Sequence, residues 1–152
     1  MIEPADVVTA VADGVCQLAR GTLTPADREA LIDAMAALYA EQTDVRHPFA
    51  PLGDTPLRTR AEVREHFSRI DGEGVERYDV VDARVHRTDD PEVVIFEFTY
   101  AGSLRGRDFA VPCIFVMRVR DGVIVESRDY ADHIGMARAF DRLPALASAL
   151  AG

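Results

Sequence analysis

The sequence predicts one α+β domain in which helices come first and antiparallel strands follow. Apolar residues recur at spacings of three and four up to residue 70, as on one face of a helix. From residue 75 onward they recur at spacings of two, as on one face of a strand. Helices followed by strands, rather than alternating with them, favour an α+β fold over a doubly wound sheet. The 152 residues suffice for one domain, 1–152, with a core of its own.

Three helices are expected in the first half of the chain. The first covers residues 5–18, and with its linker it makes up residues 1–25. The second runs over residues 26–40, because Thr24 can cap it and Pro25 suits its first turn. The third covers residues 60–70, whose apolar stripe consists of Val63, Phe67 and Ile70.

The segment between the second and third helices, residues 41–59, is predicted to be a loop. Pro48, Pro51 and Pro56 prevent a long regular element there. Residues 45–47 can form a short strand that stops at Pro48. His47 at its end is either a pocket residue or an ordinary surface histidine.

Strands are predicted at 78–87, 92–100 and 112–132, and Phe109–Val111 leads into the last. Asp121-Gly122 divides that last block into a hairpin, because this dipeptide favours the positive φ angles of a tight turn. Residues 133–150 are predicted to be one helix or two short ones interrupted at Pro144. The alanine-rich tail, 144–152, is expected to fray.

Composition excludes several classes of function. The net charge is −9, which disfavours a nucleic-acid partner. All 17 basic residues are arginine, so a lysine Schiff base is excluded. No apolar run reaches the roughly 18 residues of a membrane span. No metal-ligand spacing, phosphate-binding loop or dinucleotide motif is present, so neither a metal nor a cofactor is expected.

The two cysteines indicate a compartment. Cys16 falls in a predicted helix and Cys113 in a predicted core strand, without a CxxC spacing. They are therefore predicted to be buried thiols rather than a disulfide, which favours the cytoplasm.

The end of the last strand carries a candidate acid. Val123, Val125, Ser127 and Asp129 share one face of that strand. An apolar row that ends in a hydroxyl and a carboxylate is typical of a pocket wall. The alternative is that Asp129 lies at a solvated strand end and caps a loop.

Three local strings, in this order, resemble the SnoaL-like branch of the nuclear transport factor 2-like superfamily. They are VRHPF at 45–49, RAEVREHF at 60–67, and the closing pair RDGVI at 120–124 and RDYAD at 128–132. This superfamily includes ketosteroid isomerase, limonene epoxide hydrolase and polyketide cyclases. The resemblance implies a cone: a curved antiparallel sheet wrapped around three N-terminal helices, with one central pocket, and in many members a dimer.

The resemblance also implies roles for individual residues. Asp129 matches the carboxylate that the epoxide hydrolases and polyketide cyclases use as a base. His47 matches the position of the catalytic aspartate of ketosteroid isomerase, and an imidazole with its ordinary pKa near 6.5 suits proton transfer. The sequence departs from both enzymes, because Glu97 and Thr99 stand where the hydrolase has an arginine and an aspartate. Phe115 replaces the protonated aspartate of the isomerase, so neither named activity can be transferred.

These residues predict a protein that binds a small apolar molecule in the cone. It is expected either to act on that molecule as a cofactor-free isomerase, cyclase or epoxide hydrolase, or to be a non-catalytic binding or dimerisation module. His47, Asp129 and Glu97 are the candidate catalytic residues, with Tyr100 or Tyr130 as a phenol donor. The candidate ligand-binding residues are Tyr39, Phe49, Phe67, Thr99, Cys113, Phe115 and Met117.

Each candidate also has an ordinary structural interpretation. Glu97 can be a buried acid paired with Arg105, Arg107 or Arg118, and the tyrosines can serve packing. His66 and His133 are expected at the surface, and Cys113 is expected to be a core thiol. If Glu97 and Asp129 both face the pocket, an apolar set faces outward, which predicts a homodimer through the sheet; the set is Val94, Phe96, Phe98, Ile114 and Val116.

Overall fold

The structure, a computed structural model, describes residues 2–152. It contains the predicted helices and later strands, but residues 41–59, predicted to be a loop, include most of one strand and all of a second, both of which precede the third helix. The helices are α1 (Pro4–Ala19), α2 (Pro25–Ala36), α3 (Arg60–Ser68), α4 (His133–Ala139) and α5 (Leu143–Ala151). The strands are β1 (Tyr39–Arg46), β2 (Leu57–Thr59), β3 (Val75–Arg87), β4 (Val93–Leu104), β5 (Arg107–Arg120) and β6 (Val123–Ala131). This confirms the α+β class.

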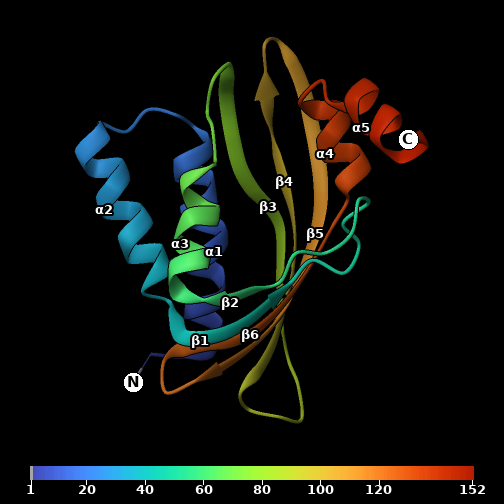
Figure 1. Cartoon of the computed structure of the whole chain (residues 1–152). Coiled ribbons are helices and arrows are strands. Elements are labelled where there is room, and N and C mark those ends of the chain that lie inside the picture. Colours follow the sequence, from blue (N-terminus) through green and yellow to red (C-terminus); the bar gives the residue numbers. More distant parts are fainter. Residues whose placement is uncertain (1) are drawn as a thin grey trace.

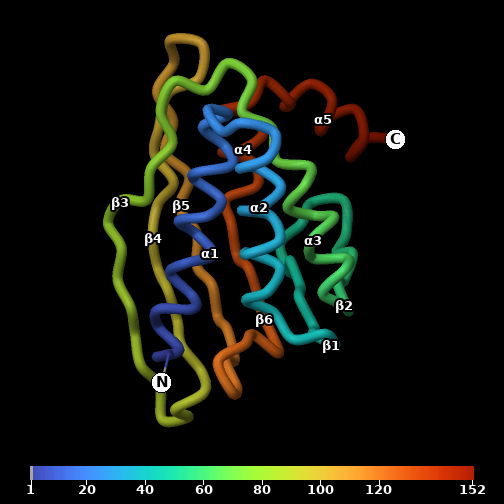
Figure 2. Tube along the Cα trace, turned by 90° about the vertical axis from the view of Figure 1, so that its left-hand side faces the viewer, coloured from blue at the N-terminus to red at the C-terminus, as the bar shows by residue number. Residues whose placement is uncertain are grey.

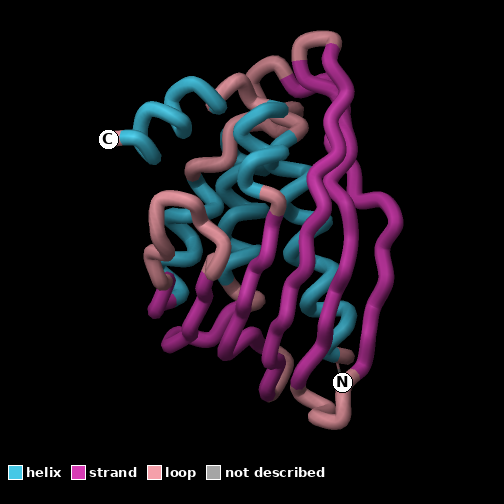
Figure 3. Tube along the Cα trace, turned by 90° about the vertical axis from the view of Figure 1, so that its right-hand side faces the viewer, coloured by secondary structure: helices cyan, strands magenta, loops and turns pink. Residues whose placement is uncertain are grey.

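The six strands form one curved sheet in the order β2-β1-β6-β5-β4-β3. The sheet curls around α1, α2 and α3, which lie on its concave side (Figures 1 and 2). Figure 3 shows the sheet from the opposite side, with the strands in front of these helices. The expected cone is thus confirmed, with one refinement: β1 runs parallel to β6, while the other neighbouring strands are antiparallel.

Local sequence determines where the helices begin. The Thr24 hydroxyl accepts a hydrogen bond from the backbone N–H of Asp27 at the start of α2. At the start of α3, Thr59 and Glu62 form a capping box, in which each side chain accepts from the other residue's backbone N–H. Such caps satisfy N–H groups that have no partner inside the helix.

The second helix is shorter than predicted, and the following strand is longer. α2 ends at Ala36, and Tyr39 is already the first residue of β1. The spacing of Leu38 and Tyr39 continued the helical stripe, but Tyr39 is buried in the core, where its ring packs on Phe67 with centroids 6.0 Å apart. Packing of this aromatic side chain therefore outweighs the local helical pattern.

The concave face of the sheet forms most of the core. Phe96 of β4 lies opposite Phe115 of β5, which lies opposite Asp129 of β6. Residues opposite one another in neighbouring strands share a face. Asp129 therefore projects from the same face as the buried phenylalanines, into the interior of the cone.

The predicted assignment of strand faces is wrong in two respects. On β6, Ile124 rather than Val123 or Val125 shares the buried face of Ser127, because the pairing of β5 with β6 shifts register between Arg118 and Val119. Glu97 lies opposite Ile114, and Ile114 lies opposite Tyr130, so these three share the convex face. The register puts Phe96 and Phe98 inside, although they were expected outside. Period two separates two faces of a strand but does not identify the covered one, and both faces of β4 are apolar.

The C-terminal segment forms two short helices. α4 ends at Ala139, and Pro144 lies in the first turn of α5, so the break precedes the proline. α5 has no buried residue and packs on α4. Fraying of residues 144–152 stays a prediction. Among the described residues, no helix is both long enough and apolar enough to cross a membrane.

Candidate functional site

The parallel pairing of β1 and β6 brings the two principal candidates together. Val45 lies opposite Ser127, and Arg46 lies opposite Arg128. His47 directly follows the last residue of β1, and Asp129 is the next residue of β6. The two side chains therefore meet where the pairing of β1 with β6 ends. Local sequence does not indicate this contact, because the partners are 82 positions apart in the chain.

His47 lies between two carboxylates. Its Nε2 is 3.5 Å from Oδ2 of Asp129, and its Nδ1 is 3.8 Å from Oδ1 of Asp54. The same Asp54 oxygen accepts the backbone N–H of His47 at 2.9 Å, which holds the loop 47–54 against the imidazole. The side chains of His47 and Asp129 are only 22% and 17% exposed. Both distances exceed that of a direct hydrogen bond, so a proton can pass between the ring and a carboxylate only after the two groups draw closer together.

Burial sets the acidity of Asp129. Removal from water is the main cause that raises its pKa above the usual value, because it disfavours the charged carboxylate. The imidazole of His47 and a hydrogen bond from the Ser127 hydroxyl oppose this and lower the pKa. Ser127 is fully buried, so its hydroxyl fixes the carboxylate. A carboxylic acid with a raised pKa is suited to exchange protons closer to neutrality.

Asp129→Asn is expected to change the pH dependence of stability. Because the folded carboxyl holds its proton more tightly than the unfolded one, its contribution favours folding at low pH and is lost as pH rises through the folded pKa. The variant lacks this loss, so its unfolding free energy should rise relative to that of wild type as the pH increases above the usual carboxyl pKa of 3.8. Urea denaturation over this range measures it, with Asp89→Asn, at an exposed turn, as control. A difference independent of pH would contradict the burial of an ionisable Asp129.

Two further histidines lie near the pair: His66 is exposed, as the sequence predicted, whereas His133 is half-buried. The ring centroid of His66 is 5.4 Å from that of His47. Burial, followed by His47 and Arg69, lowers the pKa of His66 to about 4, so this ring is neutral at physiological pH. His66 keeps solvent contact because it lines a cavity. His133 has a buried Nε2 with no hydrogen-bond partner among residues 2–152, and burial lowers its pKa.

The cavity beside His66 has a volume of about 480 Å³. Its walls come from α1, the end of α3, β3, β4 and α4, so it opens into the cone. Its lining residues are Val15, Ala19, His66, Arg69, Ile70, Asp71, Tyr78, Tyr100, Met136, Phe140 and Arg142. The ring of His66 lies between this cavity and His47. The His47–Asp129 pair is therefore behind His66 and not in the cavity wall itself.

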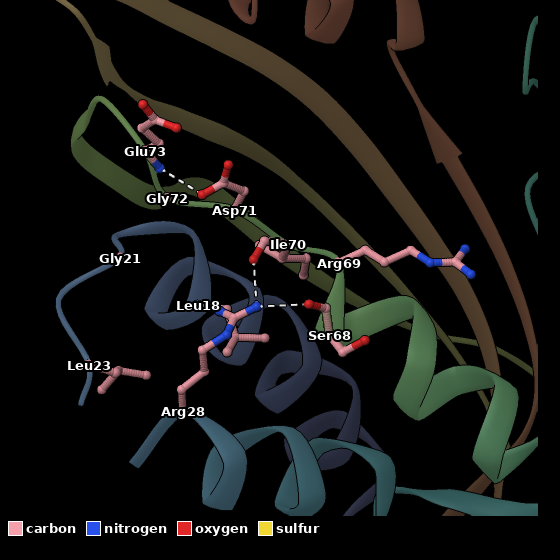
Figure 4. Close-up of a pocket in the computed structure, with 10 residues that line it drawn as sticks. All are labelled: Leu18, Gly21, Leu23, Arg28, Ser68, Arg69, Ile70, Asp71, Gly72 and Glu73. Atoms are coloured by element: carbon pink, nitrogen blue, oxygen red, sulfur yellow. Dashed lines mark hydrogen bonds between the residues drawn. The ribbon is translucent and has the colours of Figure 1, made fainter. Parts of the chain in front are cut away.

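A second hollow, of about 530 Å³, lies between the α1–α2 turn and the segment after α3 (Figure 4). There Arg28 donates hydrogen bonds to the carbonyl oxygens of Ser68 and Ile70, at 2.9 and 2.7 Å. The Asp71 carboxylate accepts the N–H of Glu73 at 3.0 Å. These polar groups are occupied in holding the backbone, so the hollow is a weaker candidate than the cavity beside His66.

The structure does not bring Glu97, the third predicted catalytic residue, to the pair. Its carboxylate is 46% exposed on the convex face, 3.9 Å from Arg84 and 3.7 Å from His86. Its partners are therefore not the arginines considered from the sequence. Glu97 projects from the convex face of the sheet and Asp129 from the concave face, so Glu97 is not part of the candidate site.

The predicted ligand-binding residues divide into two groups. Five are buried in the interior: Tyr39, Phe67, Cys113, Phe115 and Met117. Thr99 shares the convex face of Glu97, and Phe49 is 66% exposed and packs on Tyr130. Thr99, Phe49 and Tyr130 therefore lie away from Asp129, whereas Tyr100, the other expected phenol donor, lines the cavity.

The remaining chemical groups are structural. Cys16 and Cys113 are free and buried, and burial raises the pKa of each thiol to about 12, so neither is a ready nucleophile. Within the described part of the chain, no three His, Cys, Asp or Glu side chains gather closely enough to hold a metal ion.

Comparison with known proteins agrees with this fold. The family model of the SnoaL-like domain matches residues 7–127, so the chain belongs to the SnoaL-like family. A search of curated proteins finds no match.

Solved structures of similar fold include a proposed isomerase from Bacillus subtilis, with a TM-score of 0.69 and 19% identity, covering 93% of this chain and 97% of that one. A proposed polyketide cyclase from Pseudomonas putida has a TM-score of 0.66 and 13% identity, with 91% and 98% covered. A Catenulispora acidiphila protein with a ketosteroid isomerase-like fold, in complex with trimethylamine, has a TM-score of 0.62 and 21% identity, with 91% and 93% covered. At these identities the likeness shows the fold alone.

Proposed function

We propose that this protein binds a small apolar molecule in its cone and acts on it by proton transfer through Asp129 and His47, without a cofactor. The observation that carries the proposal is the half-buried pair itself, in which the Asp129 carboxylate and the His47 ring are 3.5 Å apart, near a partly apolar cavity. Isomerisation and cyclisation both begin with removal of a proton next to a carbonyl group. The similar structures described as an isomerase and a polyketide cyclase support this class.

Each residue of the site has a distinct role in this proposal. Asp129 is the base, because a carboxylate with a raised pKa binds a proton more strongly than an ordinary carboxylate does. His47 is held by Asp54 and can receive or return the proton at Nε2. Ser127 fixes the other carboxylate oxygen, so that one oxygen faces the imidazole.

A second candidate function is non-catalytic binding of the same ligand class. It is favoured by one observation: the cavity wall includes His66 but neither His47 nor Asp129. A ligand in that space would touch the pair only if His66 moved or the ligand reached past it.

Histidine NMR distinguishes these sites directly. The chain has four histidines, of which His86 lies on the convex face and serves as an internal control. Titration with 1-indanone, a neutral bicyclic ketone, should shift the ring signals of His66 and His47 and leave His86 unchanged. Unchanged His66 and His47 signals at saturating ketone would overturn binding beside the pair.

We also propose that the protein forms a two-fold dimer through the convex face of the sheet. With the register corrected, this face carries Ile95, Ile114 and Val116 beside Val81, and Ile114 and Val81 are 38% and 37% exposed. Within residues 2–152, α1, α2 and α3 cover only the opposite face (Figure 3). A patch of this kind on a sheet is typical of an interface between copies.

Sedimentation tests the dimer. At micromolar concentration the wild type should sediment at twice the monomer mass of 16.7 kDa. Ile114→Glu should sediment as a monomer, because it places a charge in the middle of the patch. Leu150→Glu, on α5, changes another exposed apolar residue, 54% exposed, away from the sheet and should stay dimeric. A monomeric wild type would contradict the proposal.

We also propose a cytoplasmic location, which the two buried free thiols support.

A further inference from the structure

Two guanidinium groups stand in the wall of the cone cavity. Arg69 is the residue that ends α3, and Arg142 precedes α5. In Figure 4 the Arg69 side chain extends away from the hollow around Arg28. A largely apolar cavity with two cationic groups in its wall has more charge than a purely apolar ligand requires.

These two charges are only weakly compensated by the protein. Arg69 pairs with Glu65 at 2.8 Å, but both side chains are largely exposed, at 71% and 66%. Such an exposed pair contributes little to stability, so a ligand can replace it. The Arg142 guanidinium lies 5.6 Å above the ring of Phe140, a cation–π contact that involves no acid.

The wall of the cavity carries net positive charge, whereas the whole chain is negatively charged. Asp71 is the acid in the lining, and its Oδ1 accepts the N–H of Glu73. With His66 neutral, the two arginines and Asp71 leave one net positive charge on the wall. The protein as a whole has a net charge of −9, so a positive wall here is a local feature.

The rest of the wall is suited to a hydrophobic body. Val15, Ile70 and Met136 contribute aliphatic surface, and Phe140 contributes an aromatic ring. Tyr100 is a buried member of the wall, and burial raises its pKa well above the usual value, so its phenol stays neutral.

We propose that the cavity takes an amphipathic carboxylate, whose apolar body lies among Val15, Ile70 and Phe140 and whose carboxylate binds Arg69 and Arg142. Guanidinium groups bind carboxylates with paired N–H donors, and this contact gives orientation as well as affinity. The charged end of the ligand is held at the arginines, on the side of the cavity where Arg69 lies one helical turn after His66. This inference rests on the proposed function and specifies its ligand class.

A matched acid and ester test this directly. The neutral dye N-phenyl-1-naphthylamine reports occupancy of the cavity by its fluorescence, and 2-naphthoate and methyl 2-naphthoate displace it. Wild type should bind the acid more tightly than the ester. In the Arg69→Gln, Arg142→Gln double variant, affinity for the acid should fall about tenfold while affinity for the ester stays the same. Arg84→Gln, an exposed arginine on the convex face, should behave as wild type.

The outcomes separate this inference from the proposed function. Displaceable dye binding with an acid-to-ester preference that does not change in the double variant would overturn the arginine site and leave ligand binding in the cone intact. Absence of dye binding, or dye binding that persists when Val15→Trp fills the cavity of a folded variant, would overturn both. Circular dichroism verifies that each variant is folded.

Discussion

Gly102→Ala is expected to lower the unfolding free energy by about 4 kcal/mol, at the upper end of single-substitution effects. Gly102 lies in β4, where β3 has a register shift between Val75 and Arg77. A Cβ at this position would lie 1.9 Å from the carbonyl oxygen of Arg77 and 2.8 Å from Cζ of Phe109. The nearer atom belongs to the backbone, so relief requires β3 and β4 to separate. This pairing holds Tyr78 and Tyr100, which line the cavity.

Gly106→Ala, in the hairpin after β4, is the matched control. Gly106 has φ +79°, but a Cβ there would meet no atom within 4 Å. We expect it to cost about 1 kcal/mol, the usual penalty for a side chain in the left-handed region. Urea denaturation followed by circular dichroism measures both variants. Equal costs would show that the close approach of β3 does not require a glycine at position 102.

Much of the fold could be predicted from the sequence because its signals are local. Thr24 and Thr59 start helices by hydrogen bonds within a few residues of the chain. Asp121 and Gly122 both have positive φ, 52° and 80°, as their sequence predicts for a tight turn. Each of these features depends on neighbouring residues alone, so no knowledge of tertiary contacts is needed.

The face of each strand could not be predicted in the same way. β4 alternates between Phe96 or Phe98 on one face and Ile95 on the other, and both sets are apolar. Only the register with β5 decides which set faces the helices. The misplacement of Glu97 follows directly from this ambiguity.

Two residues near the pair, His66 and Asp54, were not predicted as site residues, and they differ in whether the sequence contains a signal for them. His66 lies three residues after Val63 and four before Ile70, which places it beside the buried stripe of α3 and could have indicated an inward orientation. Asp54 gives no such signal. Its contact with His47 depends on the turns of the loop 47–53, where the Ala50 and Gly53 N–H groups each donate to a carbonyl three residues earlier.

The largest effect on chemistry is expected for Asp129→Asn acting on a base-sensitive probe. 5-Nitrobenzisoxazole is apolar and neutral, and a base that removes its ring C–H proton causes the N–O bond to break in the same step, giving a coloured phenolate. General base catalysis typically contributes about 100- to 10,000-fold, so loss of the carboxylate should reduce the rate at least 100-fold. His47→Gln should reduce the rate less, because the imidazole assists the base rather than attacking the C–H bond.

Glu97→Gln is the matched control for this measurement, because it removes a carboxylate from the convex face of the same sheet. The central claim is that the base is the buried Asp129 beside His47. The rate of phenolate release by wild type, Asp129→Asn and Glu97→Gln tests it most directly. The account predicts a rate above buffer for wild type and Glu97→Gln, and a rate at the level of buffer for Asp129→Asn. Equal rates for wild type and Asp129→Asn would contradict it.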